Sequence, residues 1–328
     1  MIHGGCVWDS GRPADWLDFS ANLRPEGPPE WVPDALRTTL EDIRYYPDRQ
    51  MTRARQGLAA FTGLPEEWVL PTAGGTAAID LALTRFSGCV YIREPAFGEY
   101  SRRAAIHGRR HMAWSGNCGP GDTLILSNPD NPTGTVQTKE TMLALHKRLH
   151  AAGAELVADE AFIDYCPEHS LRGHVAPGLT IAGSLTKILG IPGIRLGFLC
   201  AVPETIREYQ ERMLPWSLST QAAEIAARLP EHTDGIREDA ERNRQRREVF
   251  ARQLESLGAE VTPSRSNFLL ADFRRDMTGP AEELKSRGIL VRTCGSFGLG
   301  DSFLRLAVRT EMENERLITA LEGILHAR

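Results

Sequence analysis

The sequence has no two cysteines at the C-x-x-C spacing that holds zinc or forms a redox motif. Its six cysteines are scattered along 328 residues, and several lie in apolar runs, where a buried free thiol is the ordinary state. Free thiols are typical of a reducing compartment. We therefore expect no metal site, and we expect the protein to be cytoplasmic.

Long apolar runs, a targeting segment and an excess of basic charge are also missing. No apolar stretch approaches the ~20 residues that span a membrane, and residues 1–13 lack the basic start and apolar core of a signal peptide. The net charge is −5, and the densest basic stretch, Arg242 to Arg252, alternates with acids as in a solvated helix. We expect no nucleic-acid partner and no membrane partner.

The sequence does contain a regular alternation of short apolar segments and helical patterns. Apolar segments of this length between helices predict an α/β fold, in which helices cover both faces of a largely parallel sheet. The strands are expected at residues 68–71, 89–92, 123–127, 155–159, 179–183 and 195–202, and the helices at 31–43, 52–62, 76–85, 97–107, 139–152 and 204–213.

The composition changes towards both ends of the chain. The first 30 residues are rich in Gly, Pro and Trp and predict an irregular arm. A long polar helix is expected near residues 234–257, followed by strands at 267–273, 289–292 and 303–308 and by a final helix at 311–326. We therefore predict an arm (1–30) that contributes to the small domain and substrate pocket, a large domain (31–220) and a small α+β domain (221–328).

Polar groups follow three of the expected strands. They lie in Asn128-Pro-Asp-Asn-Pro-Thr-Gly134, in Asp159-Glu-Ala-Phe162, and in Ser184-Leu-Thr-Lys187 with Arg195 eight residues on. Ligands of open α/β sheets bind at the carboxyl ends of strands, so this placement indicates a site. Each segment alone also has a plain structural explanation: a rigid loop, a helix N-cap and a surface lysine.

Taken in order, these three motifs resemble those of the fold-type I enzymes that use pyridoxal 5′-phosphate (PLP). The sequence resembles the class I and II aminotransferases over essentially its whole length, and within them the histidinol-phosphate aminotransferase branch. The resemblance implies a large domain with a mainly parallel seven-stranded sheet between helices, a smaller α+β C-terminal domain, and PLP as the cofactor.

The resemblance also implies a role for each matching residue. Lys187 is the catalytic lysine that carries PLP, and Asp159 is the buried carboxylate that keeps the pyridine nitrogen protonated. Asn131 donates to the phenolic oxygen, and Phe97 stacks on the ring, although a core phenylalanine is the simpler interpretation of Phe97 alone. The cofactor phosphate is expected to meet a helix N-terminus, hydroxyl groups and a cation, supplied by Gly74, Gly75, Thr76, Ser184, Thr186 and Arg195.

Two further aromatic positions bear on this site. Tyr46 matches a tyrosine that dimers of the family lend to the neighbouring subunit's cofactor phosphate, which implies a homodimer. Phe162 is a departure, because many members of the family have tyrosine after D-E-A. Without that hydroxyl the phenolic oxygen of PLP relies more on Asn131, and the pKa of the internal aldimine is expected to differ.

Arginines near the C-terminus predict the type of substrate. Arg305 matches the arginine that grips a substrate α-carboxylate, and Arg292 matches the position that holds the phosphate in histidinol-phosphate aminotransferases. Arg309 falls on the same strand face as Arg305. Each arginine alone is equally well explained as a surface residue. Together they predict a small, doubly anionic substrate such as a phosphorylated amino acid, without showing which arginine meets which group.

The N-terminal segment resembles the opening of the L-threonine-O-3-phosphate decarboxylases of cobalamin biosynthesis, on His3-Gly-Gly5 and Leu17-Asp-Phe-Ser-Ala-Asn-Leu23. The resemblance implies that His3, Gly5 and Asn22 line the substrate end of the pocket. It also implies decarboxylation of L-threonine O-3-phosphate to (R)-1-amino-2-propanol phosphate. Two alternatives remain: a histidinol-phosphate aminotransferase or related aminotransferase, and a non-catalytic PLP-binding protein.

Overall fold

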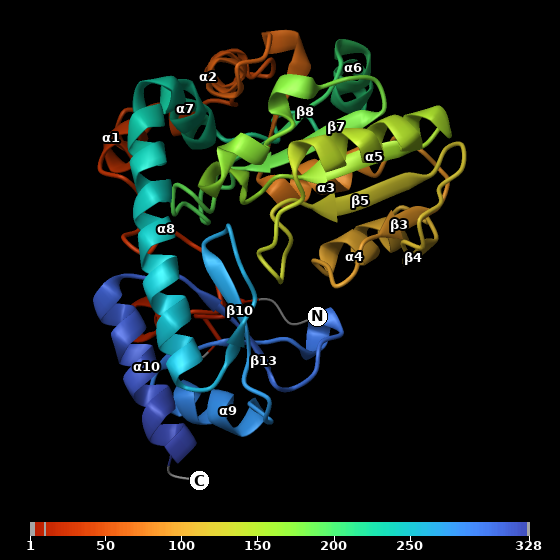
Figure 1. The fold of residues 1–328 in the computed structure, drawn as a ribbon. Helices are drawn as coiled ribbons and strands as arrows, with labels where there is room; N and C mark the ends of the chain where they lie inside the picture. Colours follow the sequence, from red (N-terminus) through yellow and green to blue (C-terminus); the bar gives the residue numbers. More distant parts are fainter. Residues whose placement is uncertain (1–3, 10, 327–328) are drawn as a thin grey trace.

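A computed structural model describes residues 4–9 and 11–326. A seven-stranded sheet lies at the centre of the upper part in Figure 1, in the order β2-β8-β7-β6-β5-β3-β4. Its strands from β3 to β7 are parallel, while β8 runs antiparallel to both neighbours. This confirms the expected, mainly parallel sheet. The bounds are β2 (Val69–Thr72), β3 (Val90–Ile92), β4 (His111–Ala113), β5 (Thr123–Ser127), β6 (Glu155–Asp159), β7 (Leu179–Ser184) and β8 (Gly197–Cys200).

Helices cover both faces of this sheet, which explains why its central strands are apolar throughout. In β5, Leu124 and Leu126 join one core cluster while Ile125 joins another, because successive side chains point to opposite faces. In Figure 1, α5 lies in front of the sheet and α3 behind it. One face packs against α1 (Trp31–Arg37), α2 (Thr52–Thr62), α5 (Lys139–Ala151) and α7 (Thr220–Arg228), the other against α3 (Gly75–Ala82), α4 (Glu99–Ile106) and α6 (Pro203–Arg212).

A long helix, α8 (Thr233–Ser256), runs from the upper part to the lower part of the molecule (Figure 1). Near its C-terminal end, Phe250 and Leu254 belong to a separate core cluster built with the lower sheet and helices. That sheet is antiparallel, in the order β12-β13-β10-β9. The elements are β9 (Glu260–Val261), β10 (Phe268–Asp272), α9 (Thr278–Ser286), β12 (Arg292–Thr293), β13 (Phe303–Ala307) and α10 (Glu311–His326).

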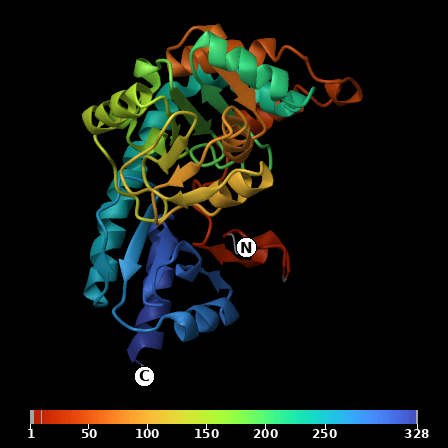
Figure 2. The ribbon, with the colours of Figure 1, turned by 90° about the vertical axis from the view of Figure 1, so that its right-hand side faces the viewer.

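The N-terminal segment is more regular than the sequence predicted. A short strand, β1 (Leu17–Asp18), pairs in parallel with β11 (Ile289–Leu290), and Figure 2 shows this segment beside the C-terminal part. Phe19 is fully buried against Phe250, and its carbonyl accepts from Ala307 N at 2.9 Å. A two-residue strand gives too little alternation to be recognised in a sequence.

One expected helix is shorter than predicted. The helix that begins at Trp31 ends at Arg37 rather than at residue 43, and a separate 3₁₀ turn covers Asp42–Arg44. The hydroxyls of Thr38 and Thr39 donate to the carbonyls of Ala35 and Leu36, a local bond that competes with helix continuation. Within the described part of the chain, none of the helices has both the length and the apolarity required to cross a bilayer.

Candidate active site

The three polar segments meet at one edge of the central sheet, where parallel strands end. Asp159 is the last residue of β6 and lies level with Ser127 of β5 and Ala182 of β7. Asn131 follows β5 in the loop, and Ser184 ends β7. Because parallel strands share one direction, their carboxyl ends bring these groups to the same place.

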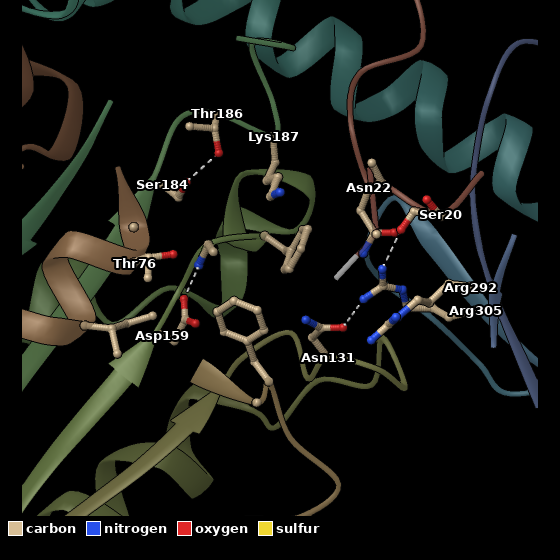
Figure 3. Close-up of a pocket in the computed structure, with 18 of the residues that line it drawn as sticks. Ser20, Asn22, Thr76, Asn131, Asp159, Ser184, Thr186, Lys187, Arg292 and Arg305 are labelled. Carbon is tan, nitrogen blue, oxygen red and sulfur yellow. Dashed lines mark hydrogen bonds between the residues drawn. The ribbon is translucent and has the colours of Figure 1, made fainter. Parts of the chain in front are cut away.

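A cavity of about 250 Å³ opens at this edge, between the central sheet and the C-terminal part. Figure 3 shows Lys187, Asp159 and Thr76 on one side of it and Arg292 and Arg305 on the other. The residues that the sequence predicted and that line this cavity are Asn22, Gly75, Thr76, Phe97, Asn131, Asp159, Ser184, Thr186, Lys187, Arg195, Arg292 and Arg305.

One end of the cavity is suited to a phosphate. Gly74 caps the N-terminus of α3 with φ 89°, and a Cβ built there would lie 2.6 Å from Nη2 of Arg195. Gly74 is thus the residue that leaves room for the guanidinium, although it is not itself in the wall. The hydroxyls of Ser184 and Thr186 are 2.8 Å apart beside it. Backbone N–H groups, hydroxyls and a cation gathered at a helix start form an anion site.

Lys187 is half-buried in the cavity wall, between this end and the arginines. Burial, and then the positive charges of Arg305 and Arg195, lower the pKa of its amine to about 8, while Asp159 opposes the shift. At pH 7 roughly a tenth of the amine is therefore neutral, far more than for a lysine with the ordinary pKa, and a neutral amine is the form that attacks a carbonyl. The placement fits the role of a cofactor-carrying lysine.

The carboxylate of Asp159 is fixed by two donors. The Tyr100 hydroxyl donates to Oδ2 at 2.6 Å, and the Ala161 backbone N–H donates to Oδ1 at 2.9 Å. Burial raises the pKa of Asp159, and these two hydrogen bonds pull the pKa back down. A buried carboxylate held in this way is suited to pair with a protonated ring nitrogen.

Two arginines form the opposite wall. Arg305 is buried, and its guanidinium donates to Asn131 Oδ1 at 2.7 Å and to the Ser20 carbonyl at 2.8 Å (Figure 3). Arg292 stands directly opposite it in the antiparallel pair of β12 and β13, and donates to Ser296 Oγ at 2.6 Å. Burial, and then the charge of Arg292, lower the pKa of Arg305 to about 10.

The structure places other predicted residues outside the cavity wall. Arg309 donates to the Asp18 carbonyl at 3.0 Å and pairs with Glu313 at 2.8 Å, so its guanidinium supports the N-terminal segment instead. Gly5 donates to Ser20 Oγ at 2.8 Å, and it is the neighbouring Gly4 that lines the cavity.

Tyr46 is 80% exposed and packs on Trp216 at 4.8 Å, away from the cavity of its own chain. His3 lies outside the described residues.

Several wall residues carried no recognisable signal in the sequence. Ser20, Ser296 and Phe297 reach the cavity wall only through tertiary packing. The same holds for Tyr100, which is buried behind Asp159 and is not itself in the wall. Asn22 is 3% exposed, and in the described part of the chain its Oδ1 has no hydrogen-bond partner. An unsatisfied buried polar atom at a cavity wall is suited to a polar ligand.

The residues present fit PLP. The glycine-lined start of α3, with Ser184, Thr186 and Arg195, would hold the phosphate, and Lys187 would carry the aldehyde carbon. Asp159 would face the pyridine nitrogen, and Phe97, which is in the cavity wall, would face the ring. Phe162 lines the cavity without a hydroxyl, and its ring packs on Phe268 at 5.1 Å.

Comparison with known proteins gives consistent relationships. The sequence profile of the family "Aminotransferase class I and II" matches residues 14–321. The chain is 31% identical to a threonine-phosphate decarboxylase of Salmonella typhimurium, covering 98% of this chain and 96% of that protein. It is 29% identical to a histidinol-phosphate aminotransferase of Moorella thermoacetica, covering 95% and 86%.

Among solved structures, an L-threonine-O-3-phosphate decarboxylase from Porphyromonas gingivalis superimposes with a TM-score of 0.85 at 25% identity. The alignment covers 94% of this chain and 99% of that one. The match over nearly the whole of both chains confirms the fold-type I architecture expected from the motifs.

Proposed function

Since this chain belongs to the class I and II aminotransferase family, whose enzymes use PLP, we propose that it decarboxylates L-threonine O-3-phosphate to 1-amino-2-propanol phosphate for cobalamin assembly. The observation that carries this proposal is the pair formed by Arg292 and Arg305, directly opposite each other on β12 and β13. Like charges opposite each other in a ladder repel, so an anion bound between the two guanidinium groups would stabilise the pair.

The charge of the pair matches a phosphate better than a carboxylate. A phosphate monoester carries about −1.5 to −2 charges near neutral pH, and a carboxylate carries one. Nε of Arg305 has no hydrogen-bond partner among the described residues, and Arg292 donates to the exposed Ser296 hydroxyl at the cavity wall. We infer that both arginines bind the substrate phosphate, with Asn22 beside them.

The position of Arg305 bears on the type of reaction. Its guanidinium donates to Asn131, the residue expected at the edge of the PLP ring. A substrate group bound by Arg305 would therefore lie beside Asn131. If that group is the phosphate, the carboxylate would not be held by Arg305 and would be free to leave.

Each residue of the site then has a defined task. When bound, PLP withdraws the electron pair left on Cα as CO₂ departs. Asp159 keeps the ring nitrogen protonated, so that the ring accepts this pair. Lys187, in the cavity wall beside the place of Cα, would donate the proton that replaces the carboxylate. The products are CO₂ and the amino alcohol phosphate, and no keto acid is consumed.

The alternative is a histidinol-phosphate aminotransferase, a relative of comparable identity. Histidinol phosphate has a phosphate but no carboxylate, and it needs a keto acid as the second substrate. The deciding experiment incubates the PLP-loaded protein with L-threonine phosphate without keto acid and follows CO₂ release, with Lys187→Ala as control. Release that depends on Lys187 supports the proposal. No release, together with conversion of histidinol phosphate by 2-oxoglutarate, would replace it with the aminotransferase.

We also propose that two copies form a homodimer and that Tyr46 reaches the partner's cofactor phosphate. Its side chain is exposed and packs on the partly exposed Trp216, and Ile43 and Leu214 are exposed apolar residues as well. In this assembly residues 31–220 hold PLP, and residues 1–30 and 221–328 close over the substrate. Tyr46→Phe is expected to weaken PLP binding while the dimer seen by sedimentation stays intact. A monomeric wild-type protein that binds PLP fully would contradict the assembly.

A further inference from the structure

Tyr100 occupies an unusual position behind the carboxylate of Asp159. It lies on α4, its side chain is fully buried, and its hydroxyl donates to Asp159 Oδ2 at 2.6 Å. The other oxygen of Asp159 is held by the Ala161 N–H at 2.9 Å. Each carboxylate oxygen therefore has one fixed donor, which sets the rotation of the group within the cavity wall.

The same tyrosine contacts two further parts of the site. Its ring meets the ring of Phe97 edge to face, with centroids 5.8 Å apart and planes at 90°. The Ser127 hydroxyl lies beside its phenol oxygen and acts to lower the pKa of Tyr100, and Ser127 Oγ accepts from the Asn131 N–H at 3.1 Å. One buried side chain thus touches or adjoins the residues expected at the nitrogen, the face and the phenolic oxygen of PLP.

The donor direction along this chain is fixed. A tyrosine hydroxyl has a single hydrogen, and the hydrogen points at Asp159, an acceptor when ionised. Burial, and then the charge of Asp159, raise the pKa of Tyr100 well above its ordinary value, so the phenol keeps its proton. It therefore stabilises the ionised carboxylate against burial, which otherwise favours the neutral acid.

We propose that Tyr100 is a positioning residue that keeps Asp159 ionised and aimed at the pyridine nitrogen of the cofactor. The inference rests on the role of Asp159 towards PLP and is independent of which substrate the enzyme takes. It differs from a purely structural role, because a structural tyrosine would change the stability of the fold and leave the protonation of the cofactor as it is.

The test is the variant Tyr100→Phe, which keeps the ring and its contact with Phe97 but removes the hydroxyl. Protein loaded with PLP labelled with ¹⁵N in the ring is titrated with pH, and the ring nitrogen is followed by NMR without substrate. We expect the nitrogen to lose its proton about one to two pH units lower than in the wild type, the shift that corresponds to one lost hydrogen bond to a charged group. Affinity for PLP is expected to fall roughly tenfold or more for the same reason.

The matched control is Tyr209→Phe. Tyr209 is equally buried, and its hydroxyl also donates to a buried carboxylate, that of Glu155 at 3.3 Å, which is not in the cavity wall. This variant is expected to leave the titration of the ring nitrogen unchanged. In an Asp159→Asn background, Tyr100→Phe should add no further shift, because the two residues act through one interaction.

The proposal would be overturned if the ring nitrogen lost its proton at the same pH in Tyr100→Phe as in the wild type, or if Tyr209→Phe shifted that pH as much as Tyr100→Phe does. If Tyr100→Phe does not fold, Ser127→Ala takes its place, because it leaves the tyrosine intact and removes the hydroxyl beside its oxygen, together with the acceptor of the Asn131 N–H. A smaller shift in the same direction is expected there, and an unchanged titration would count against the proposal. Because no substrate is present, these results are separate from those of the CO₂ assay.

Discussion

Replacing Arg292 with glutamine is expected to affect binding and stability in opposite directions. Arg292 and Arg305 are cross-strand partners, and the charge of Arg292 contributes to the lowered pKa of Arg305. Without an anion, removing one charge relieves a repulsion of up to about 1 kcal/mol. The hydrogen bond lost to Ser296 is replaced by water, since Ser296 is exposed. The free energy of unfolding of the PLP-free protein should therefore stay constant or rise by about 1 kcal/mol.

Binding of phosphate should weaken in the same variant. A hydrogen bond to a charged group contributes about 1.5–3 kcal/mol, and about 1.4 kcal/mol corresponds to a tenfold change in affinity. We therefore expect the Kd of the PLP-loaded protein for 1-amino-2-propanol phosphate to rise about 10- to 150-fold in Arg292→Gln. Calorimetry gives this Kd, and urea denaturation of the PLP-free protein gives the stability.

The matched control is Arg309→Gln. Arg309 follows β13 closely, as Arg305 lies within it, but its guanidinium donates to the Asp18 carbonyl and pairs with Glu313, outside the cavity wall. It should lower the free energy of unfolding by about 1 kcal/mol and leave the Kd unchanged. An Arg292→Gln protein that is destabilised as much as Arg309→Gln, with unaltered phosphate affinity, would refute the assignment of the pair to an anion.

Three other perturbations test the cofactor end of the site. The rate at which PLP-free protein takes up PLP should rise with pH and level off above about 8, because only the neutral Lys187 amine reacts; a rate still rising well above that pH would contradict the lowered pKa. Phe162→Tyr adds a donor near the phenolic oxygen, favours its ionised form, and should move the pH titration of the cofactor's absorption band to lower pH; a shift to higher pH would place the hydroxyl elsewhere. Gly74→Ala places a side chain at a residue with φ 89°, a backbone conformation that costs about 1–3 kcal/mol, and brings its Cβ against Nη2 of Arg195. Equilibrium dialysis should therefore show weaker PLP binding, and unchanged binding would mean that Arg195 does not hold the phosphate.

The cofactor end of the site could be predicted from the sequence because its residues lie in three local motifs. Asp159, Ser184 and Asn131 each follow an apolar strand directly, and parallel strands bring their ends together. The chain order of the motifs therefore determines their position in space. The same argument does not reach Tyr100, which is three residues after Phe97 on an ordinary amphipathic helix, where nothing separates it from a core residue.

The substrate end depended far more on the tertiary structure. Arg305 and Arg309 follow the same strand period, yet only Arg305 enters the cavity, because Arg309 comes after β13 has ended and its guanidinium turns to Asp18 and Glu313. Similarly, Gly4 lines the cavity in place of Gly5, since the N-terminal segment bends around Ser20. Side-chain direction at strand ends and in loops depends on packing between segments far apart in the sequence.

The sequence by itself thus determined the fold class, most of the strands and helices of the central sheet, and the residues that line one end of the cavity, because these follow from local periodicity and from motifs in a fixed order along the chain. The short edge strand β4 (His111–Ala113) was not expected. Only the tertiary structure decided which arginines share the cavity, how β1 joins the C-terminal part, and which side chain stands behind Asp159. Those features arise from contacts such as Arg305 with Ser20 or Tyr100 with Asp159, between residues 285 and 59 positions apart, and no local pattern encodes them.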